Sequence, residues 1–207
     1  MELISHNLGC VRGGREVFQG LSFRGAAGNG LLLTGPNGSG KSSLLRVIAG
    51  FILPAAGTLE LRGGDEDTPL SEQCHYVGHL NGVKRTLTVY ENLAFWVDYL
   101  ANGNSKSENV KRALAAFDLE SLAGIPARLL SAGQARRLGL ARIALVHRPL
   151  WLLDEPTVSL DTGSRKLLAR VIKDHLKNDG IVIAATHAPL GVKFSQTLKL
   201  GQGRVRP

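Results

Sequence analysis

The sequence predicts an α/β fold with a β-rich N-terminal part, a core of alternating strands and helices, and a helical insertion. Three observations predict it. Short apolar runs bounded by turn residues, such as 31–33 and 181–185, are typical of buried strands. A glycine-rich segment, 35–42, joins one such run to an amphipathic segment, as in a strand–loop–helix unit. Between 88 and 147, apolar residues instead recur at helical spacing.

Residues 1–85 are expected to form mainly strands. The turn signals Gly28-Asn29-Gly30 and Pro54 lie between the apolar runs. The amphipathic segment after the glycine-rich loop predicts one helix. The expected elements are strands over 3–6, 16–23 and 31–33, a helix over 41–49, a strand over 58–62 and a buried strand that ends at 75–78.

The middle of the chain is expected to be helical. Segments 88–91 and 105–108 both fit the capping-box pattern, in which Ser or Thr is followed three residues later by Glu. We interpret the aromatic residues at helical spacing behind these caps as core. The expected elements are helices over 88–100, 105–117 and 132–147, with a turn over 102–104.

The α/β pattern returns after residue 149. The expected elements are a strand over 150–153, a helix over 162–177, a strand over 181–185 and a closing hairpin with its turn at Gly201-Gln202-Gly203. The expected organisation is a single domain over 1–207, with an α/β core (1–85 and 150–207) and a helical subdomain (86–149).

Composition excludes several classes of protein. The chain has 207 residues, 43% of them hydrophobic, which suffices for one sizeable core. No apolar run approaches the roughly 18–20 residues that span a bilayer, and we expect no secretory signal at the N-terminus. Cys10 and Cys74 do not have metal-ligand spacing, and we interpret both as reduced core residues.

The net charge of +8 leaves two interpretations open. A basic balance favours polyanions such as nucleotide, nucleic acid or an anionic membrane face. The alternative is a solvated basic helix face. The arginines in question lie in a stretch without Asp or Glu, and they are Arg128, Arg136, Arg137, Arg142 and Arg148.

The segment from Gly35 to Ser42 fits the phosphate-binding loop pattern G-x-x-x-x-G-K-[ST]. Its glycines let the backbone approach phosphate closely, and its N–H groups form an anion site with the helix N-terminus. We expect Lys41 to reach the β- and γ-phosphates of ATP, and the Ser42 hydroxyl to ligate Mg²⁺. The expected nucleotide contacts are Gly35, Pro36, Asn37, Gly38, Ser39, Gly40, Lys41, Ser42 and Ser43.

Two acids and a histidine follow predicted strands. Asp154 and Glu155 come directly after the run 150–153, and His187 follows the run 181–185. Sheets of this kind bind ligands at the carboxyl ends of parallel strands. We expect Asp154 to hold Mg²⁺ and Glu155 to orient and polarise the attacking water. His187 could bridge Glu155 and the γ-phosphate.

The segment Leu130-Ser131-Ala132-Gly133-Gln134 resembles the signature loop of ATP-binding-cassette (ABC) ATPases. With the phosphate loop and the acidic pair, it makes the chain similar to that superfamily, which has a RecA-like core. Two subunits of the superfamily sandwich two ATP molecules head to tail. The resemblance therefore implies a homodimer in which Ser131, Ala132, Gly133 and Gln134 contact the partner's ATP. Asp161 resembles the D-loop aspartate, which contacts the opposite subunit.

Three positions depart from the common pattern of the superfamily. Arg12 stands where an aromatic residue normally stacks on adenine, and a guanidinium plane can also stack on a base. His79 stands at the position of the Q-loop glutamine, and it could contact metal-bound water or sense the γ-phosphate. Ala132 replaces a signature glycine, whereas Gly133 is retained. None of these departures affects the expected catalytic positions, so an active ATPase is expected.

Several less specific sequence segments, taken together, point to one group within the superfamily. Tyr76-Val77-Gly78-His79, Trp151 before the acids, and the segment from Gly180 to Leu190 are together similar to the ATP-binding subunit of the bacterial cytochrome c maturation haem exporter. The similarity covers essentially the whole chain. It implies a translocase-class ATPase that powers haem export or delivery for c-type cytochrome biogenesis.

The same resemblance implies a peripheral subunit on the cytoplasmic face of the bacterial inner membrane. Its partners would be a second copy of the chain and integral membrane permease subunits, with no nucleic acid. Two alternatives stay open, namely the ATPase of a lipid or drug exporter and a non-transport ABC ATPase that acts on nucleic acid. The second is disfavoured because the chain has room for neither a long coiled coil nor a second fused cassette.

Overall fold

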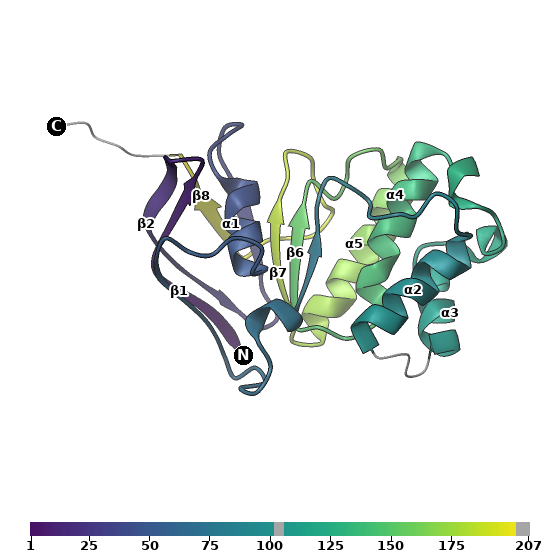
Figure 1. Ribbon diagram of the computed structural model, residues 1–207, viewed down its shortest axis with the longest axis horizontal. Coiled ribbons are helices and arrows are strands. Elements are labelled where there is room, and N and C mark those ends of the chain that lie inside the picture. Colours follow the sequence, from purple (N-terminus) through teal and green to yellow (C-terminus); the bar gives the residue numbers. More distant parts are fainter. Residues whose placement is uncertain (102–105, 202–207) are drawn as a thin grey trace.

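The computed structural model describes residues 1–101 and 106–201. The expected turn over 102–104, the expected cap Ser105 and the residues after Gly201 lie outside this range. The described part contains two sheets with helices around them (Figure 1). Among the described helices, none is both long and apolar enough to cross a membrane.

Three antiparallel strands form one end of the molecule (Figure 1). They are β1 (Glu2–Arg12), β2 (Arg15–Ala26) and β4 (Ala56–Arg62), in the order β2-β1-β4. The ladder between β1 and β2 shifts register three times between Ser5 and Val11. Asn7 takes a left-handed backbone conformation (φ 47°) at the first shift. Irregularities of this kind bend and twist a strand pair, which curves this sheet.

A parallel sheet forms the centre of the molecule. Its strands are β3 (Gly30–Thr34), β5 (Cys74–Val77), β6 (Leu150–Asp154), β7 (Ile181–Ala185) and β8 (Gln196–Lys199). They lie in the order β5-β6-β7-β3-β8, and each neighbouring pair is parallel. Every residue of β6 and β7 is buried, as in strands covered on both faces. Because the strands are parallel, their carboxyl ends meet at one edge.

Helices cover both faces of the parallel sheet. They are α1 (Lys41–Ile48), α2 (Val89–Ala101), α3 (Lys106–Ala116), α4 (Ala132–Ala141) and α5 (Thr162–Lys177). Short 3₁₀ turns occur at η1 (Leu70–Glu72), η2 (Glu120–Leu122), η3 (Ala127–Leu129) and η4 (Arg142–Ala144). Figure 1 shows α1 between the two sheets, and α5, α4, α2 and α3 on the other side of β6 and β7.

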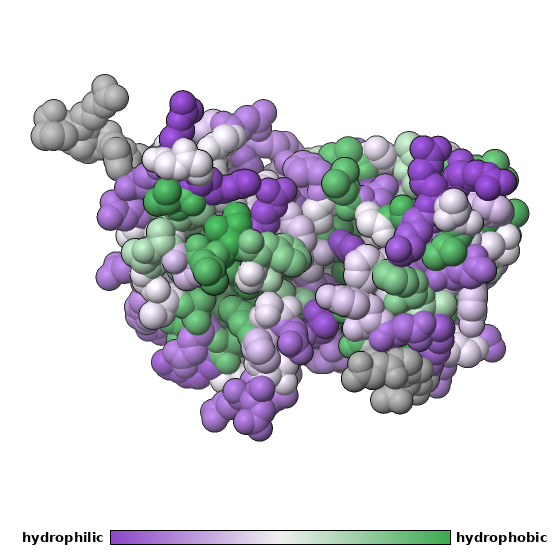
Figure 2. Space-filling model, viewed as in Figure 1, coloured by the Kyte–Doolittle hydropathy of each residue, from purple (hydrophilic) through white to green (hydrophobic). Residues whose placement is uncertain are grey.

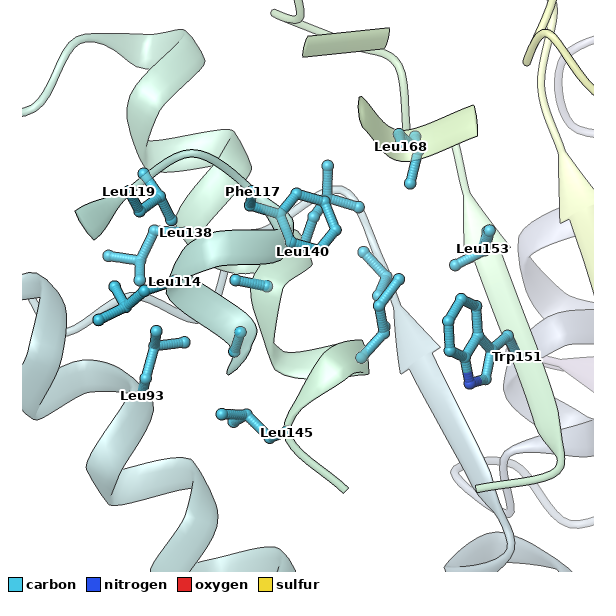
Figure 3. Packing of buried hydrophobic residues seen from close by; sticks show 14 of the residues in the cluster. Leu93, Leu114, Phe117, Leu119, Leu138, Leu140, Leu145, Trp151, Leu153 and Leu168 are labelled. Carbon is cyan, nitrogen blue, oxygen red and sulfur yellow. The ribbon is translucent and has the colours of Figure 1, made fainter. Parts of the chain in front are cut away.

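Alternate residues of β6 contribute to two different hydrophobic cores. Leu150 and Leu152 belong to a cluster with α1 and the antiparallel sheet, whereas Trp151 and Leu153 belong to a cluster with the helices. This alternation follows from the two-residue period of a strand. Figure 3 shows the second cluster, in which leucines of the helical part pack toward Trp151 and Leu153. The helical part is therefore joined to the sheet by continuous apolar packing.

Most expected elements are found near their expected bounds, and α5 and β7 match them. The capping box at the start of α2 is also formed. The Thr88 hydroxyl accepts a hydrogen bond from Glu91 N (3.1 Å), and Glu91 Oε2 accepts one from Thr88 N (2.7 Å). The expected aromatic core position Phe117 is buried. The division of the chain at 86 and 149 stays a prediction.

One expectation at the end of a helix was wrong. The helix expected to run to His147 ends at Ala141 and is followed only by η4. Pro149 disfavours helical geometry at Arg148, and the chain must extend into β6 directly afterwards.

The described part of the closing segment is β8, which pairs in parallel with β3 at the edge of the sheet. Leu200, directly after β8, is buried in the core beside α1. The expected hairpin stays a prediction. The remainder of the expected hairpin, including Gln202 and Gly203, lies outside the described residues.

Candidate functional site

The glycine-rich segment forms a tight loop between β3 and α1. Gly35, Gly38 and Gly40 all have positive φ angles (139°, 80° and 99°), which favour glycine. A Cβ atom at Gly35 would overlap the carbonyl oxygen of Leu200, so a side chain does not fit there. Gly40 is the N-cap of α1 and makes no side-chain cap. The N–H groups of the first turn of α1 are thus left for an anion.

Lys41, the first residue of α1, folds back over this loop. Its ammonium group donates hydrogen bonds to the carbonyl oxygens of Gly35 (2.8 Å) and Pro36 (3.0 Å). The side chain is buried, and it makes no ion pair with another of the described residues. The loop therefore holds one buried positive charge whose partners are neutral carbonyls, which suits an incoming phosphate.

Ser42 and Asp154 meet although they are far apart in the sequence. The Ser42 hydroxyl donates to Asp154 Oδ1 (3.0 Å), and the Asp154 side chain is 2% exposed. The Tyr76 hydroxyl lies 3.5 Å from the other carboxylate oxygen, Oδ2, and accepts a hydrogen bond from Arg46 Nε (3.3 Å). A hydroxyl and a carboxylate are hard oxygen donors of the kind that Mg²⁺ prefers, so the residues present fit this cation.

Glu155 and His187 lie beside each other at the carboxyl ends of β6 and β7. Glu155 N donates to Ala185 O (2.8 Å), and Glu155 has a left-handed backbone (φ 47°). Its Oε1 lies 3.7 Å from His187 Nε2, which exceeds a direct hydrogen bond. The His187 side chain is 60% exposed and that of Glu155 is 17% exposed. Both groups can therefore reach a substrate above the sheet edge.

Arg136 of α4 is a buried residue of this site that the sequence did not reveal. Its guanidinium donates to the carbonyl oxygens of Glu155 (2.9 Å) and Gly78 (2.9 Å) and to Asn81 Oδ1 (3.0 Å). Burial lowers the pKa of this guanidinium, while the nearby carboxylate of Asp154 acts in the opposite direction. Arg136 thus ties α4 to the backbone that follows β5 and β6. Its sequence context, a pair of arginines on a helix, carries no signal for burial.

The other arginines of the basic stretch are mostly bonded to backbone carbonyls. Arg137 donates to Phe117 O (2.9 Å), Arg142 to Tyr76 O (2.7 Å) and Arg148 to Cys74 O (2.7 Å). Arg128 alone among the five is exposed. The interpretation of this stretch as a solvated basic face was therefore wrong for four of its five members, because their guanidinium groups satisfy loop and strand-end carbonyls.

The segment around Ser131 starts α4 with a complete capping box. The Ser131 hydroxyl accepts from Gln134 N (3.2 Å), and Gln134 Oε1 accepts from Ser131 N (2.9 Å). Ser131 and Ala132 are exposed. A Cβ atom at Gly133 would lie 3.1 Å from Ser159 O, so a larger residue would press on the neighbouring loop. This segment does not line the cavity at the phosphate loop.

Asp161 is the N-cap of α5. Its Oδ1 accepts a hydrogen bond from Ser164 N (2.7 Å), and the hydrogen bonds from Ser164 lower the pKa of the carboxyl group. The side chain therefore has a structural role within its own chain. Its expected contact with an opposite subunit stays a prediction.

Arg12 and His79 lie on two sides of the loop region. Arg12 is exposed at the end of β1 and lines a cavity of about 460 Å³ together with Lys41, Ser42 and Ser43. His79 Nε2 lies 3.8 Å from Asp154 Oδ1, and its side chain is 56% exposed. The fold thus brings the phosphate loop to the same sheet edge as Asp154, Glu155, His79 and His187. The segment around Ser131 lies apart from this edge.

Comparison with known proteins gives the family. Residues 18–158 match the family model described as ABC transporter. The chain is 50% identical over 192 residues to the cytochrome c biogenesis ATP-binding export protein CcmA of Rhodopseudomonas palustris strain HaA2, covering 93% of this chain and 94% of that protein. It is 48% identical to the protein of the same name from Bradyrhizobium diazoefficiens, covering 97% and 98%.

Solved structures agree with this assignment at the level of the fold. An ATP-binding subunit of an ABC transporter matches with a TM-score of 0.85 at 22% identity, over 97% of this chain and 86% of that chain. A dimeric ATP-binding cassette in a post-hydrolysis state, bound to ADP and Pi, matches with a TM-score of 0.80 at 22% identity, over 96% and 94%. The chain belongs to the ABC transporter family and, within it, to the cytochrome c biogenesis ATP-binding export proteins.

Proposed function

We propose that this chain is the ATP-hydrolysing subunit of a membrane complex that exports or delivers haem for c-type cytochrome biogenesis. One observation carries the proposal. Beside the phosphate-binding loop, at one sheet edge, Ser42 contacts Asp154 and Glu155 lies next to His187. The names of the relatives support the role in export for cytochrome c biogenesis. The assignment of haem as the cargo rests on the similarity of the sequence to the ATP-binding subunit of the cytochrome c maturation haem exporter.

In this proposal the loop 35–43 holds the phosphates of ATP. Lys41 would exchange its two carbonyl partners for oxygens of the β- and γ-phosphates, since an ionised acceptor makes the stronger hydrogen bond. Ser42 and Asp154 would hold Mg²⁺, which neutralises phosphate charge when bound. Arg12, at the outer wall of the cavity, would stack on the adenine.

Hydrolysis would depend on Glu155 and His187. The Glu155 carboxylate would accept a hydrogen bond from the attacking water and orient it toward the γ-phosphate. His187 would bridge Glu155 and that phosphate, because an imidazole can donate through one nitrogen and accept through the other. The 3.7 Å between the two side chains would shorten on binding, as catalytic hydrogen bonds often do.

We further propose that two copies of the chain enclose two ATP molecules head to tail. The segment 131–134 of each copy would cap the γ-phosphate held by its partner, using the N-terminus of α4 as the anion site. Asp161 would lie at the interface between the two copies. A fold neighbour that is itself dimeric supports this arrangement.

Integral membrane permease subunits are the proposed partners, on the cytoplasmic face of the inner membrane. A groove of about 660 Å³ between the core and the helical part offers a surface for them. Exposed Phe51, Leu80 and Tyr99 line it, together with the guanidinium groups of Arg46 and Arg148. Figure 2 shows hydrophobic surface gathered over the region where β1 and α1 lie. The groove combines exposed apolar side chains with guanidinium groups, and this combination suits an amphipathic segment of a partner.

Affinity purification of the Glu155→Gln variant with ATP from gently solubilised membranes tests this function. Recovery of membrane proteins that handle haem for cytochrome c maturation is the expected result. Recovery of a lipid or drug permease would keep the ATPase and overturn the haem assignment. Recovery of no membrane protein, together with salt-sensitive binding of nucleic acid, would overturn the role in export.

A further inference from the structure

The backbone of Glu155 is held from two sides. Its N–H donates to the carbonyl oxygen of Ala185 on β7 (2.8 Å), and its own carbonyl oxygen accepts a hydrogen bond from Arg136 Nη2 on α4 (2.9 Å). A longer bond from Val158 N (3.3 Å) reaches the same carbonyl oxygen. Glu155 also has a left-handed backbone (φ 47°), and a residue with a side chain keeps such a conformation only where the surrounding groups fix it.

The guanidinium of Arg136 joins the segment after β5 to the segment after β6. Nη1 donates to Gly78 O (2.9 Å) and to Asn81 Oδ1 (3.0 Å). Nη2 and Nε donate to Glu155 O (2.9 Å) and Pro156 O (3.3 Å). Arg136 is 3% exposed, so water has little access to replace these bonds. A planar group with donors in fixed directions is suited to bridging two segments at once.

Arg137, the next residue of α4, also anchors this helix but in another direction. Its guanidinium donates to the carbonyl oxygens of Phe117 (2.9 Å) and Asp118 (2.8 Å), which follow α3. Both arginines thus fix α4 through backbone carbonyls, and only Arg136 donates to the backbone of Glu155. An effect shared by the two positions reports on the anchoring of α4, whereas an effect specific to Arg136 reports on Glu155.

We propose that Arg136 is a positioning residue for ATP hydrolysis, which holds the backbone of Glu155 so that its carboxylate faces the attacking water. The inference rests on the proposed function, because Arg136 acts only through Glu155. A misplacement of about 1 Å can lower the rate of a catalysed step about 10²-fold. In the competing explanation Arg136 only anchors α4, and its loss lowers stability or the assembly of two copies.

Steady-state ATPase assays on the full chain compare Arg136→Met with Arg137→Met. Methionine keeps an unbranched apolar side chain and donates no hydrogen bond. The kcat of Arg136→Met should fall about 10- to 100-fold with an unchanged KM for ATP. Arg136→Lys keeps the charge without the planar fork, so its kcat should lie between those of Arg136→Met and the wild type. Arg137→Met should lower the melting temperature and keep the wild-type kcat.

A variant that lacks the Glu155 carboxylate gives the second readout. If Arg136 acts through Glu155, Arg136→Met should not lower the residual turnover of Glu155→Gln any further, because the two effects are not additive. Light scattering with ATP should detect as many dimers for the double variant as for Glu155→Gln alone. If Arg136→Met does not fold, Arg136→Lys takes its place in both experiments.

Three outcomes would overturn the inference and leave the ATPase proposal standing. They are an equal fall of kcat in Arg137→Met, a further fall of turnover in the double variant, and a loss of dimers in the double variant. Each would assign Arg136 to the anchoring of α4. Wild-type turnover by Glu155→Gln alone would instead remove Glu155 from its proposed role, and the inference would fail with it.

Discussion

The phosphate-loop edge and the segment around Ser131 differ in how completely one chain assembles them. At the edge, Lys41 contacts the loop, Ser42 contacts Asp154, and Glu155 lies beside His187. The Ser131 segment satisfies its polar groups within its own capping box and lies outside the cavity at the loop. Figure 1 shows α1 and α4 on opposite sides of β6 and β7.

This difference separates binding from turnover. A single copy holds a buried lysine and a hydroxyl–carboxylate pair that fits a cation, so it has the groups that nucleotide binding requires. The N-terminus of α4 in that copy does not line the cavity at the phosphate loop. Changes at the sheet edge should therefore affect the chemistry of each copy, whereas changes at the start of α4 should affect assembly and turnover without affecting ATP binding by a single copy.

The largest expected effect is at Glu155. Glu155→Gln removes the carboxylate that we propose orients the attacking water, and it should lower turnover by about 10²–10⁴-fold while ATP still binds. Steady-state ATPase assays and calorimetry on the same preparation measure both quantities. Glu120→Gln, which changes an exposed carboxylate elsewhere, is the control. Turnover near the wild-type level would remove Glu155 from its assigned role.

Ser131 should separate assembly from binding. Asp and Asn are both good N-caps, so Ser131→Asp and Ser131→Asn should both keep α4. The added charge of Ser131→Asp would face the partner's γ-phosphate, and it should lower turnover by roughly 10²-fold with unchanged ATP affinity of the single copy. Light scattering with ATP should detect fewer dimers for Ser131→Asp than for Ser131→Asn. Equal dimer formation by the two variants would argue against a phosphate at this position.

Acid should weaken the core that supports the loop edge. Burial lowers the pKa of His75 to about 3 and that of His175 to about 4, from 6.5. The unfolded chain then binds more protons than the folded chain between about pH 4 and 6.5, so stability should fall as the pH decreases through this range. The slope should approach about 2.7 kcal/mol per pH unit for the two groups together.

The variant His175→Phe removes one of the two histidines and so measures its contribution to the pH dependence of stability. His175 stacks on Trp151 with ring centroids 3.7 Å apart, so a phenyl ring keeps a flat contact that cannot be protonated. The slope of unfolding free energy against pH, measured by urea denaturation, should fall by about 1.4 kcal/mol per pH unit. An unchanged slope would mean that His175 is not a neutral buried group.

The smallest expected effect is at Arg12. Stacking of an exposed guanidinium contributes about 0.5–1 kcal/mol, so Arg12→Ala should weaken ATP binding roughly two- to fivefold. Arg24→Ala on the neighbouring strand β2 is the matched control, because it also removes one exposed positive charge. If the two variants have equal dissociation constants for ATP, the loss of affinity comes from the lost charge, and the stacking of Arg12 on adenine is contradicted.

The sequence predicted the elements whose signals are local. The apolar runs of β6 and β7 and the phosphate loop carry their own signals, since periodicity and glycine spacing need no tertiary partner. It did not predict the burial of Arg136, whose carbonyl partners come from loops that only the fold brings together. The contact of Tyr76 with Asp154 was missed for the same reason, because β5 and β6 are adjacent only in the sheet.

Complementation of two inactive variants tests most directly whether the two regions belong to one shared site. Lys41→Ala impairs the phosphate loop and Ser131→Asp impairs the signature segment, so neither homodimer contains an intact site. A head-to-tail dimer with one copy of each contains one intact site, formed by the loop of one copy and the segment of the other. Mixing should restore ATP-dependent dimers and about a quarter of wild-type turnover. Activity no higher than the sum of the separate variants would contradict the shared site.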